Sequence, residues 1–236
     1  MTVAKISPAW LLTPELVAQL TPAERLVLAY RASVWARPEQ RIPTGPWRLL
    51  GIRSGRGWGK THMIVPEITR RVQSGESDTL LLMAPTEDRA EAVQIQPLIE
   101  FAPPWFRPER YRGGVRWPNG VFARVCTAET PRGAAGPSYD LVWCSELVGW
   151  NAGTRMKAWQ TMAEATRQRG AKIFYDTTNS GRNDLISFLE TDHARDPIGH
   201  RVIHGTTFDN VLLDRTYLAS VCAQYPSGSR RYTKRS

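Results

Sequence analysis

The sequence feature that most constrains this fold is a glycine-rich loop between a strand-like and a helix-like segment. The loop consists of Ser54, Gly55, Arg56, Gly57, Trp58, Gly59, Lys60 and Thr61. Residues 47–52 before it are mostly apolar, as in a buried strand, and apolar residues recur at helical spacing from Met63 to Val72. A strand, a glycine loop and a helix in this order are the context in which a phosphate-binding P-loop forms.

Every residue of this loop is a candidate contact for the phosphates of ATP. Glycines let backbone N–H groups converge on phosphate oxygens, and the N-terminus of the following helix adds partial positive charge. Lys60 would reach the β- and γ-phosphates, and the Thr61 hydroxyl would ligate Mg²⁺. Ser54 replaces the first glycine of the G-x-x-x-x-G-K-[ST] pattern, and Arg56 adds a cation. A glycine turn before a surface helix remains the alternative.

Residues 140–146 supply a candidate second motif, an apolar strand that ends in Ser145 and Glu146. In P-loop enzymes a carboxylate at this strand end holds the Mg²⁺ shell, and a following glutamate orients and deprotonates the attacking water. Glu146 fits the second role, whereas Ser145 stands where an aspartate is expected. The alternative is a strand that ends in a helix-capping Ser-x-Glu.

Other segments predict a doubly wound α/β fold with a mostly parallel sheet and helices on both faces. Further strands are predicted at residues 79–84, 121–127, 171–175 and 201–205, and the glycines near 113 and 120 predict a short hairpin. The ligand crevice of such a sheet lies at the carboxyl ends of its strands. Thr177 and Thr178 follow the strand 171–175 and are therefore candidates for sensing the γ-phosphate.

We divide the chain into residues 1–45, 46–210 and 211–236. The first part is predicted to be helical, because Thr13-Pro14 and Thr21-Pro22 are typical helix starts, and one apolar face should run from Leu26 to Val34 before Arg37-Pro38 ends the helix. Gln40 in this part could hydrogen-bond the adenine edge, although a surface glutamine is the default. The second part is the P-loop core, and the third is a tail or linker.

Composition narrows the function further. The formal net charge of +9 favours a polyanionic partner such as nucleic acid, although a basic soluble protein is the alternative. Arginines gather at residues 107–116 and 230–235, and the latter could be a phosphate-binding arm or a disordered tail. The sequence has no run of eighteen apolar residues, so we expect no membrane span. Cys126, Cys144 and Cys222 lack metal-ligand spacing, so we expect free thiols and no zinc site.

Taken together, these motifs resemble the ATPase domain of the large terminase subunit of tailed bacteriophages, the motor that packages DNA into procapsids. The resemblance covers roughly residues 36–231. It rests on the order and spacing of residues 36–40, 55–61, 84–86, 139–147 with Trp150, Thr177-Thr178, and 205–210.

The resemblance implies a RecA-like (ASCE) P-loop fold that uses ATP and Mg²⁺. It implies that Gln40 contacts adenine, that Glu146 is the catalytic base, that Thr61 and Ser145 hold the metal, and that Thr177 and Thr178 couple hydrolysis to motion. A neighbouring subunit would supply an arginine finger. The family's usual Arg-Gly-Pro is Ala135-Gly136-Pro137 here, so the nearest candidate is Arg132, with Arg56 as a cation of the same chain.

The implied partners are double-stranded DNA, the portal protein, the small terminase subunit and further copies of this chain in a ring, expected to be a pentamer, although the isolated domain could be a monomer. The implied location is the host cytoplasm, transiently at the procapsid portal. Large terminases also carry a nuclease domain with clustered acids. Asp214 is the one acid after Asn210, so we expect a fragment without nuclease activity.

The sequence therefore predicts an ATP-hydrolysing motor that moves double-stranded DNA into a procapsid. Two alternatives stay open. One is another P-loop translocase or helicase, which should lack the motif at residues 205–210. The other is a catalytically weak nucleotide-binding assembly module, which Ser145 favours and the intact Lys60, Thr61 and Glu146 oppose.

Overall fold

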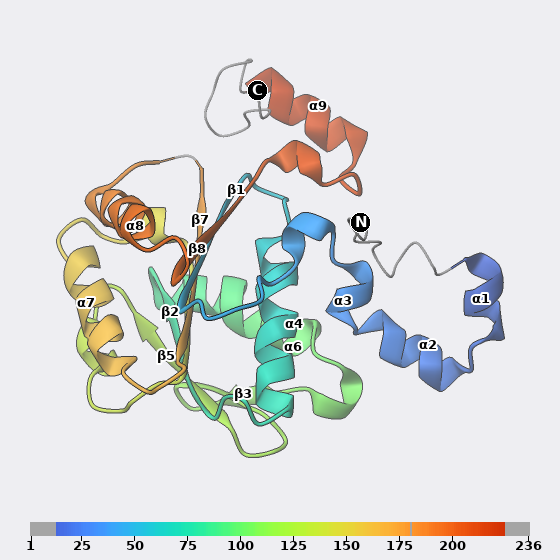
Figure 1. The fold of residues 1–236 in the computed structure, drawn as a ribbon, viewed down its shortest axis with the longest axis horizontal. Coiled ribbons are helices and arrows are strands. Elements are labelled where there is room, and N and C mark those ends of the chain that lie inside the picture. Colours follow the sequence, from blue (N-terminus) through green and yellow to red (C-terminus); the bar gives the residue numbers. More distant parts are fainter. Residues whose placement is uncertain (1–12, 180, 225–236) are drawn as a thin grey trace.

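Apolar segments bounded by turns form a single eight-stranded sheet in the computed structural model, which describes residues 13–179 and 181–224 (Figure 1). Its strands are β1 (Leu49–Ser54), β2 (Thr79–Ala84), β3 (Glu109–Tyr111), β4 (Gly114–Arg116), β5 (Phe122–Thr127), β6 (Leu141–Cys144), β7 (Lys172–Thr178) and β8 (His200–Gly205). The spatial order is β3-β4-β5-β2-β6-β7-β1-β8. β3, β4 and β5 pair antiparallel, as the predicted hairpin requires, and all other pairs are parallel.

The position of β7 determines how the site is assembled. β7 lies between β1, which leads into the glycine loop, and β6, which leads to Ser145 and Glu146. Its register places Ile52 beside Asp176 on one side and Cys144 beside Tyr175 on the other. Because these strands are parallel, their carboxyl ends meet at one edge of the sheet. The predicted doubly wound, mostly parallel fold is thereby confirmed.

Helices cover both faces of the sheet. α4 (Lys60–Gln73) and α6 (Gln96–Glu100) lie on one face, and α7 (Arg155–Ala165) and α8 (Asp184–Arg195) lie on the other (Figure 1). α5 (Glu87–Ala90) and the π-helical turn η3 (Glu91–Ile95) lead directly into α6. The short 3-10 helices are η2 (Pro38–Gln40), η4 (Pro104–Phe106), η5 (Pro131–Ala134), η6 (Leu147–Gly149) and η7 (Thr207–Asp209).

The alternation of side chains along the strands creates two separate apolar cores. Leu50, Ile52 and Phe174 pack with α4 residues such as Ile64 on one face. Tyr175 and Cys144 pack with α7 and α8 on the other, through buried residues that include Trp159, Met162, Leu185 and Leu189. Successive residues of a strand therefore point into different cores.

The N-terminal segment is helical, as predicted, and extends away from the sheet layers as α1 (Pro14–Gln19), α2 (Pro22–Ala29) and α3 (Ala32–Trp35) (Figure 1). The Thr13 hydroxyl accepts a hydrogen bond from the Leu16 N–H, and Thr21 forms a capping box with Glu24. The prediction of one continuous helix from Leu26 to Val34 is wrong. It breaks at Tyr30, whose N–H bonds to carbonyls of the preceding turn, before the extended Arg31 starts α3.

The C-terminal part also holds structure that we did not predict, because α9 (Arg215–Gln224) occupies part of the expected tail. The arginine cluster at residues 230–235 lies outside the described residues. Within the described part no helix is long and apolar enough to cross a membrane. Cys126 and Cys144 are free, as predicted. Both are buried, and burial raises the pKa of both thiols; the Cys222 thiol lies outside the described part.

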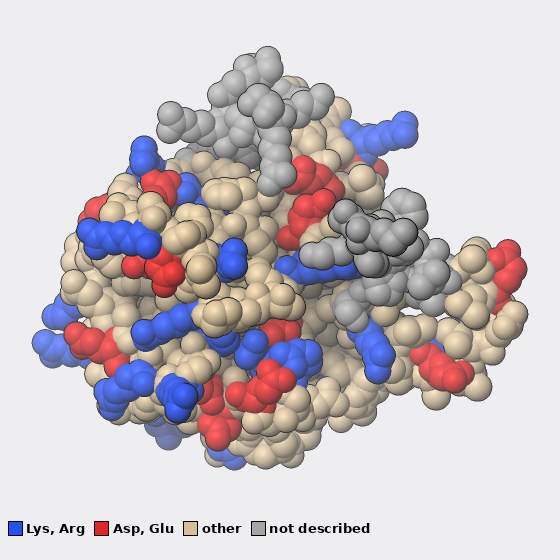
Figure 2. Space-filling model, in the orientation of Figure 1, with Lys and Arg blue, Asp and Glu red and all other residues tan. Residues whose placement is uncertain are grey.

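Charge is mixed over the surface. Lys and Arg side chains are interspersed with Asp and Glu over the face that Figure 2 shows, which is the face seen in Figure 1. Many of the arginines are paired: Arg70 bonds Glu67 and Glu76, and Arg110 bonds Glu91. The net positive charge therefore does not form one uniform basic field on this face.

Close packing between β8 and the glycine loop gives the first testable prediction. A Cβ at Gly205 would lie 2.1 Å from the indole Nε1 of the fully buried Trp58. We expect Gly205→Ala to destabilise the fold by about 1–3 kcal/mol, the usual cost of overpacking. Gly149→Ala is the matched control, because its Cβ would meet nothing closer than Pro85 Cγ at 3.4 Å. Urea denaturation should separate the variants, and equal midpoints would contradict the packing described.

Candidate functional site

The glycine loop joins the end of β1 to the start of α4, so the predicted strand, loop and helix are present. Gly57 (φ 75°) and Gly59 (φ 99°) adopt left-handed conformations that favour glycine. Gly55 is required for another reason, because a Cβ there would lie 2.4 Å from Thr207 Oγ1. Each glycine therefore permits a backbone path or contact that a side chain would obstruct.

Ser54 replaces the first glycine of the usual pattern without strain. It is the last residue of β1 and continues the parallel register with Thr178 and Gly205. Among the described residues Glu146 is the one non-glycine with a positive φ, so Ser54 has ordinary backbone geometry. The buried Ser54 hydroxyl lies 3.4 Å from the Gly55 carbonyl oxygen.

Lys60 lies over the inside of the loop. Its ammonium Nζ is 3.4 Å from the carbonyl oxygens of both Ser54 and Gly55. Burial lowers the pKa of Lys60, whereas the negative charges of Asp176 and Glu146 raise it. A cation that lies against the loop carbonyls, in the field of two acids from neighbouring strands, is well placed to meet an incoming phosphate.

Two residues of the N-terminal segment, Arg37 and Gln40, bond the backbone of the glycine loop. The sequence did not predict these contacts. The Gln40 amide Nε2 donates to the carbonyls of Trp58 and Gly59, at 3.1 and 3.2 Å. Arg37 donates to the same Trp58 carbonyl at 2.6 Å, and its guanidinium lies 5.4 Å from the centroid of the Trp58 ring. The contact of Gln40 with adenine stays a prediction, since its amide N–H groups here bond the loop itself.

The segment that follows β8, residues 206–213, also contacts the glycine loop. The Asn210 side chain donates to the Gly57 carbonyl at 2.7 Å, and Leu213 packs where a Gly57 side chain would lie. Thr206 and Asp209 form a capping box that fixes this segment. The motif at residues 205–210 therefore has a structural role at the loop.

Glu146 follows β6 in a left-handed conformation, with φ 54° and ψ 47°. Its carboxylate forms a two-pronged ion pair with Arg89 of α5, in which the Arg89 Nε lies 2.6 Å from Glu146 Oε2. This hydrogen bond is the main cause that raises the pKa of Arg89. Nothing in the sequence pointed to Arg89, because the two residues are distant in the chain.

Ser145, which precedes Glu146 in the chain, and Asp176 of β7 are almost fully buried, with 1% and 5% of their surfaces exposed. The Ser145 Oγ has no hydrogen-bond partner among the described residues. Asp176 accepts a 2.8 Å hydrogen bond from the indole N–H of Trp143. Burial raises the pKa of Asp176, and the Lys60 cation opposes that effect. A buried acid thus lies in the electrostatic field of the phosphate-loop lysine.

Thr177 connects β7 with the residues after Glu146. Its hydroxyl accepts a hydrogen bond from the Val148 N–H at 3.3 Å, and the side chain is buried. Thr178 pairs in register with Ser54 at the start of the loop. The two threonines therefore lie between the glycine loop and the Glu146 turn, as their predicted position at the strand end requires.

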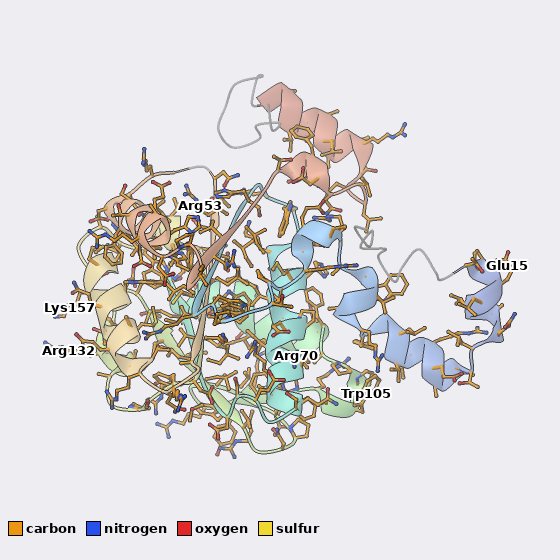
Figure 3. The ribbon with its side chains drawn as sticks, in the orientation of Figure 1. Glu15, Arg53, Arg70, Trp105, Arg132 and Lys157 are labelled. Carbon is orange, nitrogen blue, oxygen red and sulfur yellow. The ribbon has the colours of Figure 1, made fainter. Side chains whose placement is uncertain are left out.

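The two candidate arginines lie apart. Arg56 is exposed at the glycine loop, whereas Arg132 belongs to η5, which packs beside α7 on the face opposite α4. The Arg132 side chain is exposed and lies at the outer side of the molecule, away from the α4 face (Figure 3). The structure therefore does not bring Arg132 to the glycine loop of its own chain.

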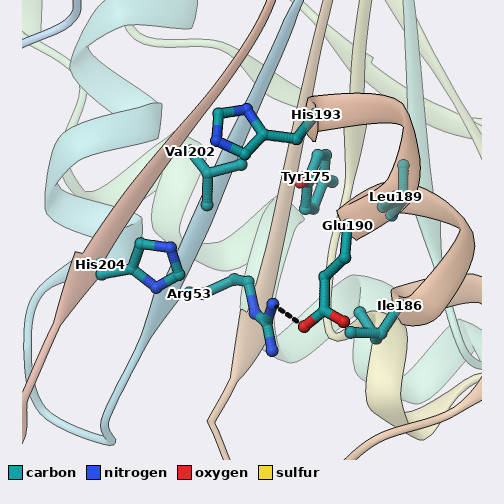
Figure 4. Close-up of a pocket in the computed structure, with 8 residues that line it drawn as sticks. All are labelled: Arg53, Tyr175, Ile186, Leu189, Glu190, His193, Val202 and His204. Carbon is teal, nitrogen blue, oxygen red and sulfur yellow. Dashed lines mark hydrogen bonds and ion pairs between the residues drawn. The ribbon is translucent and has the colours of Figure 1, made fainter. Parts of the chain in front are cut away.

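A hollow of about 210 Å³ lies on the α8 face and is separate from the glycine loop (Figure 4). Arg53 of β1 points into it, because successive strand residues face opposite ways, and bonds Glu190 at 2.5 Å. Glu190 also bonds Arg182 at 2.7 Å, and Arg53 is the first cause that lowers its pKa. This ion-pair network ties α8 to the sheet.

No group of three or more His, Cys, Asp or Glu residues in the described part could hold a metal ion by itself. The groups at the loop that suit a hard cation are the hydroxyls of Thr61 and Ser145 and the carboxylate of Asp176.

Solved structures of phage terminases share this fold. The large terminase of a thermophilic bacteriophage matches with a TM-score of 0.67 and 11% identity, over 89% of this chain and 52% of that chain. The same protein in complex with ADP matches with a TM-score of 0.64 and 13% identity, over 89% of this chain and 51% of that chain. The large terminase ATPase domain of Thermus phage P74-26 matches with a TM-score of 0.57 and 15% identity, over 97% of this chain and 98% of that chain.

This chain thus spans about half the length of the first of these large terminases and nearly all of the P74-26 ATPase domain. A comparison with curated protein sequences gives no match. The family model for the terminase large subunit, T4likevirus-type, N-terminal, matches residues 52–232. Because that match runs from the P-loop strand to beyond the last strand of the sheet, the chain belongs to the terminase large subunit family and comprises its ATPase domain.

Proposed function

We propose that this domain hydrolyses ATP and uses the energy to move double-stranded DNA into a procapsid. The observation that carries the proposal is the meeting of the glycine loop, Lys60 and Glu146 at one edge of the sheet. Structures of the thermophilic phage large terminase with ADP and with ATP-γ-S support nucleotide as the ligand class. We extend that ligand class to this chain because it shares their fold and belongs to the same family.

The residues of the chain divide the work of hydrolysis. Loop N–H groups and Lys60 would hold the phosphates, with the positive end of α4 beneath them. Glu146 would orient the attacking water and accept its proton. To do so, its carboxylate must leave Arg89, because both of its oxygens are now engaged by that guanidinium. Thr177 would transmit the change at the Glu146 turn to β7 through Val148.

The residues present fit a Mg²⁺ ion. The buried Ser145 hydroxyl lacks a partner among the described residues, and the Thr61 hydroxyl lies in the first turn of α4, so both would face the metal or its waters. When bound, Mg²⁺ would neutralise charge on the β- and γ-phosphates. Such an ion usually keeps several waters and relies on substrate phosphates, which suits a site with few carboxylates.

We propose double-stranded DNA, the portal and the small terminase subunit as partners, and a ring of this chain, expected to be a pentamer, as the working assembly at the portal in the host cytoplasm. The hairpin arginines offer a route to DNA phosphates. Arg107 and Arg112 are exposed, whereas Arg110 bonds Glu91 and Arg116 lies 3.8 Å from the ring centroid of Tyr111. Contacts of this kind are independent of sequence and weaken with salt.

The second candidate function is a catalytically weak nucleotide-binding assembly module. Ser145 favours it, because a hydroxyl brings no charge to the metal. The two functions separate by turnover, since both require nucleotide binding but the motor alone requires hydrolysis.

The first experiment tests nucleotide binding. Hydrogen bonds to charged groups contribute about 1.5–3 kcal/mol, so Lys60→Ala should weaken ADP binding roughly ten- to hundredfold. Lys157→Ala removes an exposed lysine of α7 and is the matched control. Calorimetry that gives equal ADP affinity for wild type and Lys60→Ala would remove the basis for the P-loop assignment.

The second experiment tests the base. Glu146→Gln keeps the shape of the side chain but cannot accept a proton, so it should preserve ATP binding and lower turnover of the assembled motor about 10²–10⁴-fold. Glu164→Gln, an exposed acid on α7, is the control. Wild-type turnover in Glu146→Gln would place the general base elsewhere.

The third experiment tests Arg132 as the arginine finger. A finger that acts between subunits is supplied to each site by the neighbouring subunit. An Arg132→Ala subunit with an intact Glu146 should therefore hydrolyse ATP beside a Glu146→Gln subunit with an intact Arg132, so mixed rings should recover hydrolysis that neither variant shows alone. Arg132 lies on the face opposite α4, which favours action on another subunit over action in its own site. Mixed rings that assemble and bind ATP but recover no activity would exclude this role, and would leave Arg56 as the candidate cation.

A further inference from the structure

Ser145 brings no negative charge to a position where P-loop enzymes normally have a carboxylate. A carboxylate at the end of this strand normally supplies negative charge to the metal shell. Here the side chain is a neutral hydroxyl, buried and without a hydrogen-bond partner among the described residues. A hydroxyl can bond a metal-bound water, but it cannot balance the charge of a divalent cation.

The adjacent strand carries a buried acid at the same level. Cys144 pairs with Tyr175, so the next residues along each strand, Ser145 and Asp176, are neighbours. Asp176 also pairs with Ile52 of β1, so it lies one strand nearer the glycine loop, a shift of about 4.8 Å.

Asp176 also points to the correct face. Side chains alternate along β7, and Phe174 belongs to the core beneath α4 whereas Tyr175 belongs to the core beneath α7 and α8. Asp176 therefore shares the α4 face with Phe174. Its hydrogen bond from Trp143, another residue of the α4 core, agrees with this orientation.

The hydrogen bond from Trp143 does not require a charge at Asp176. The amide oxygen of an asparagine would also accept the Trp143 N–H, whereas burying a carboxylate is unfavourable unless a cation compensates it. Lys60 is the cation whose field reaches Asp176 most strongly, and Lys60 belongs to the phosphate loop. The acid is therefore directed at the place where phosphates and their metal would bind.

We propose that Asp176 replaces the missing aspartate, supplying from β7 the negative charge that Ser145 lacks and accepting hydrogen bonds from the waters of the bound Mg²⁺. This inference rests on the proposed function. The other acid near this strand, Asp140, lies at the opposite edge of the sheet, where its carboxylate accepts from the N–H groups of Asp78 and Thr79 at 2.8 and 3.3 Å.

The test compares the affinity for ADP in the presence of Mg²⁺ with the affinity in EDTA, both measured by calorimetry. The ratio of these two affinities is called the Mg²⁺ gain below, or simply the gain. Outer-shell partners of a metal typically contribute about ten- to hundredfold to its affinity, so Asp176→Asn should lose that much of the gain while keeping its affinity in EDTA. Asp140→Asn, with the same chemical change at the other edge, should keep the wild-type gain. The double variant Ser145→Asp/Asp176→Asn should recover it, which a merely structural role for Asp176 does not predict.

A further variant keeps the test decisive if Asp176→Asn does not fold. Ser145→Asp alone should add little to the gain, because Asp176 already supplies the charge and a second carboxylate beside it is repelled. A large increase with Ser145→Asp, or an unchanged gain in folded Asp176→Asn, would overturn the role of Asp176 and leave the P-loop assignment standing. Failure of the wild type to bind ADP in either condition would instead overturn the proposed function, and this inference with it.

Discussion

The insertion of β7 between β1 and β6 is the constraint on which the rest of the site depends. It separates the glycine loop from Glu146 by one strand at the carboxyl edge of the sheet. The parallel register holds Ile52, Asp176 and Ser145 at one level, so the pairing of the strands alone places the phosphate-binding loop near two acids, Asp176 and Glu146. A slip of one residue would turn Asp176 into the opposite core, because side chains alternate along a strand.

Positive and negative side chains alternate from the glycine loop outward. Lys60 faces Asp176 and Glu146, and Glu146 is in turn held by Arg89. Burial strengthens the interaction between Lys60 and Asp176, and it makes an unpaired charge at Asp176 costly. Nucleotide binding would add negative phosphates and a positive metal to this set, so the existing pairs must rearrange. The Arg89–Glu146 pair is the most exposed of them and the easiest to break.

The loop, the Glu146 strand and the parallel sheet could be predicted from the sequence because each depends on local signals. Glycines, a Lys-Thr pair and apolar runs of strand length leave few other structures. Contacts that join distant segments could not be predicted. Gln40 bonds the loop backbone, Asn210 bonds Gly57, and Arg89 holds Glu146, and none of these pairs is close in the chain. The break at Tyr30 was missed because the apolar pattern continues across it.

The most direct test of this account is a crystal structure of the domain with Mg²⁺ and a non-hydrolysable ATP analogue. We expect the β-phosphate to lie within the loop of residues 55–60, with Lys60 moved from the Ser54 and Gly55 carbonyls onto phosphate oxygens. We also expect a metal-bound water within hydrogen-bonding distance of the Asp176 carboxylate, beside the Ser145 hydroxyl. A nucleotide bound elsewhere, or a metal shell that reaches neither Asp176 nor Ser145, would contradict this account.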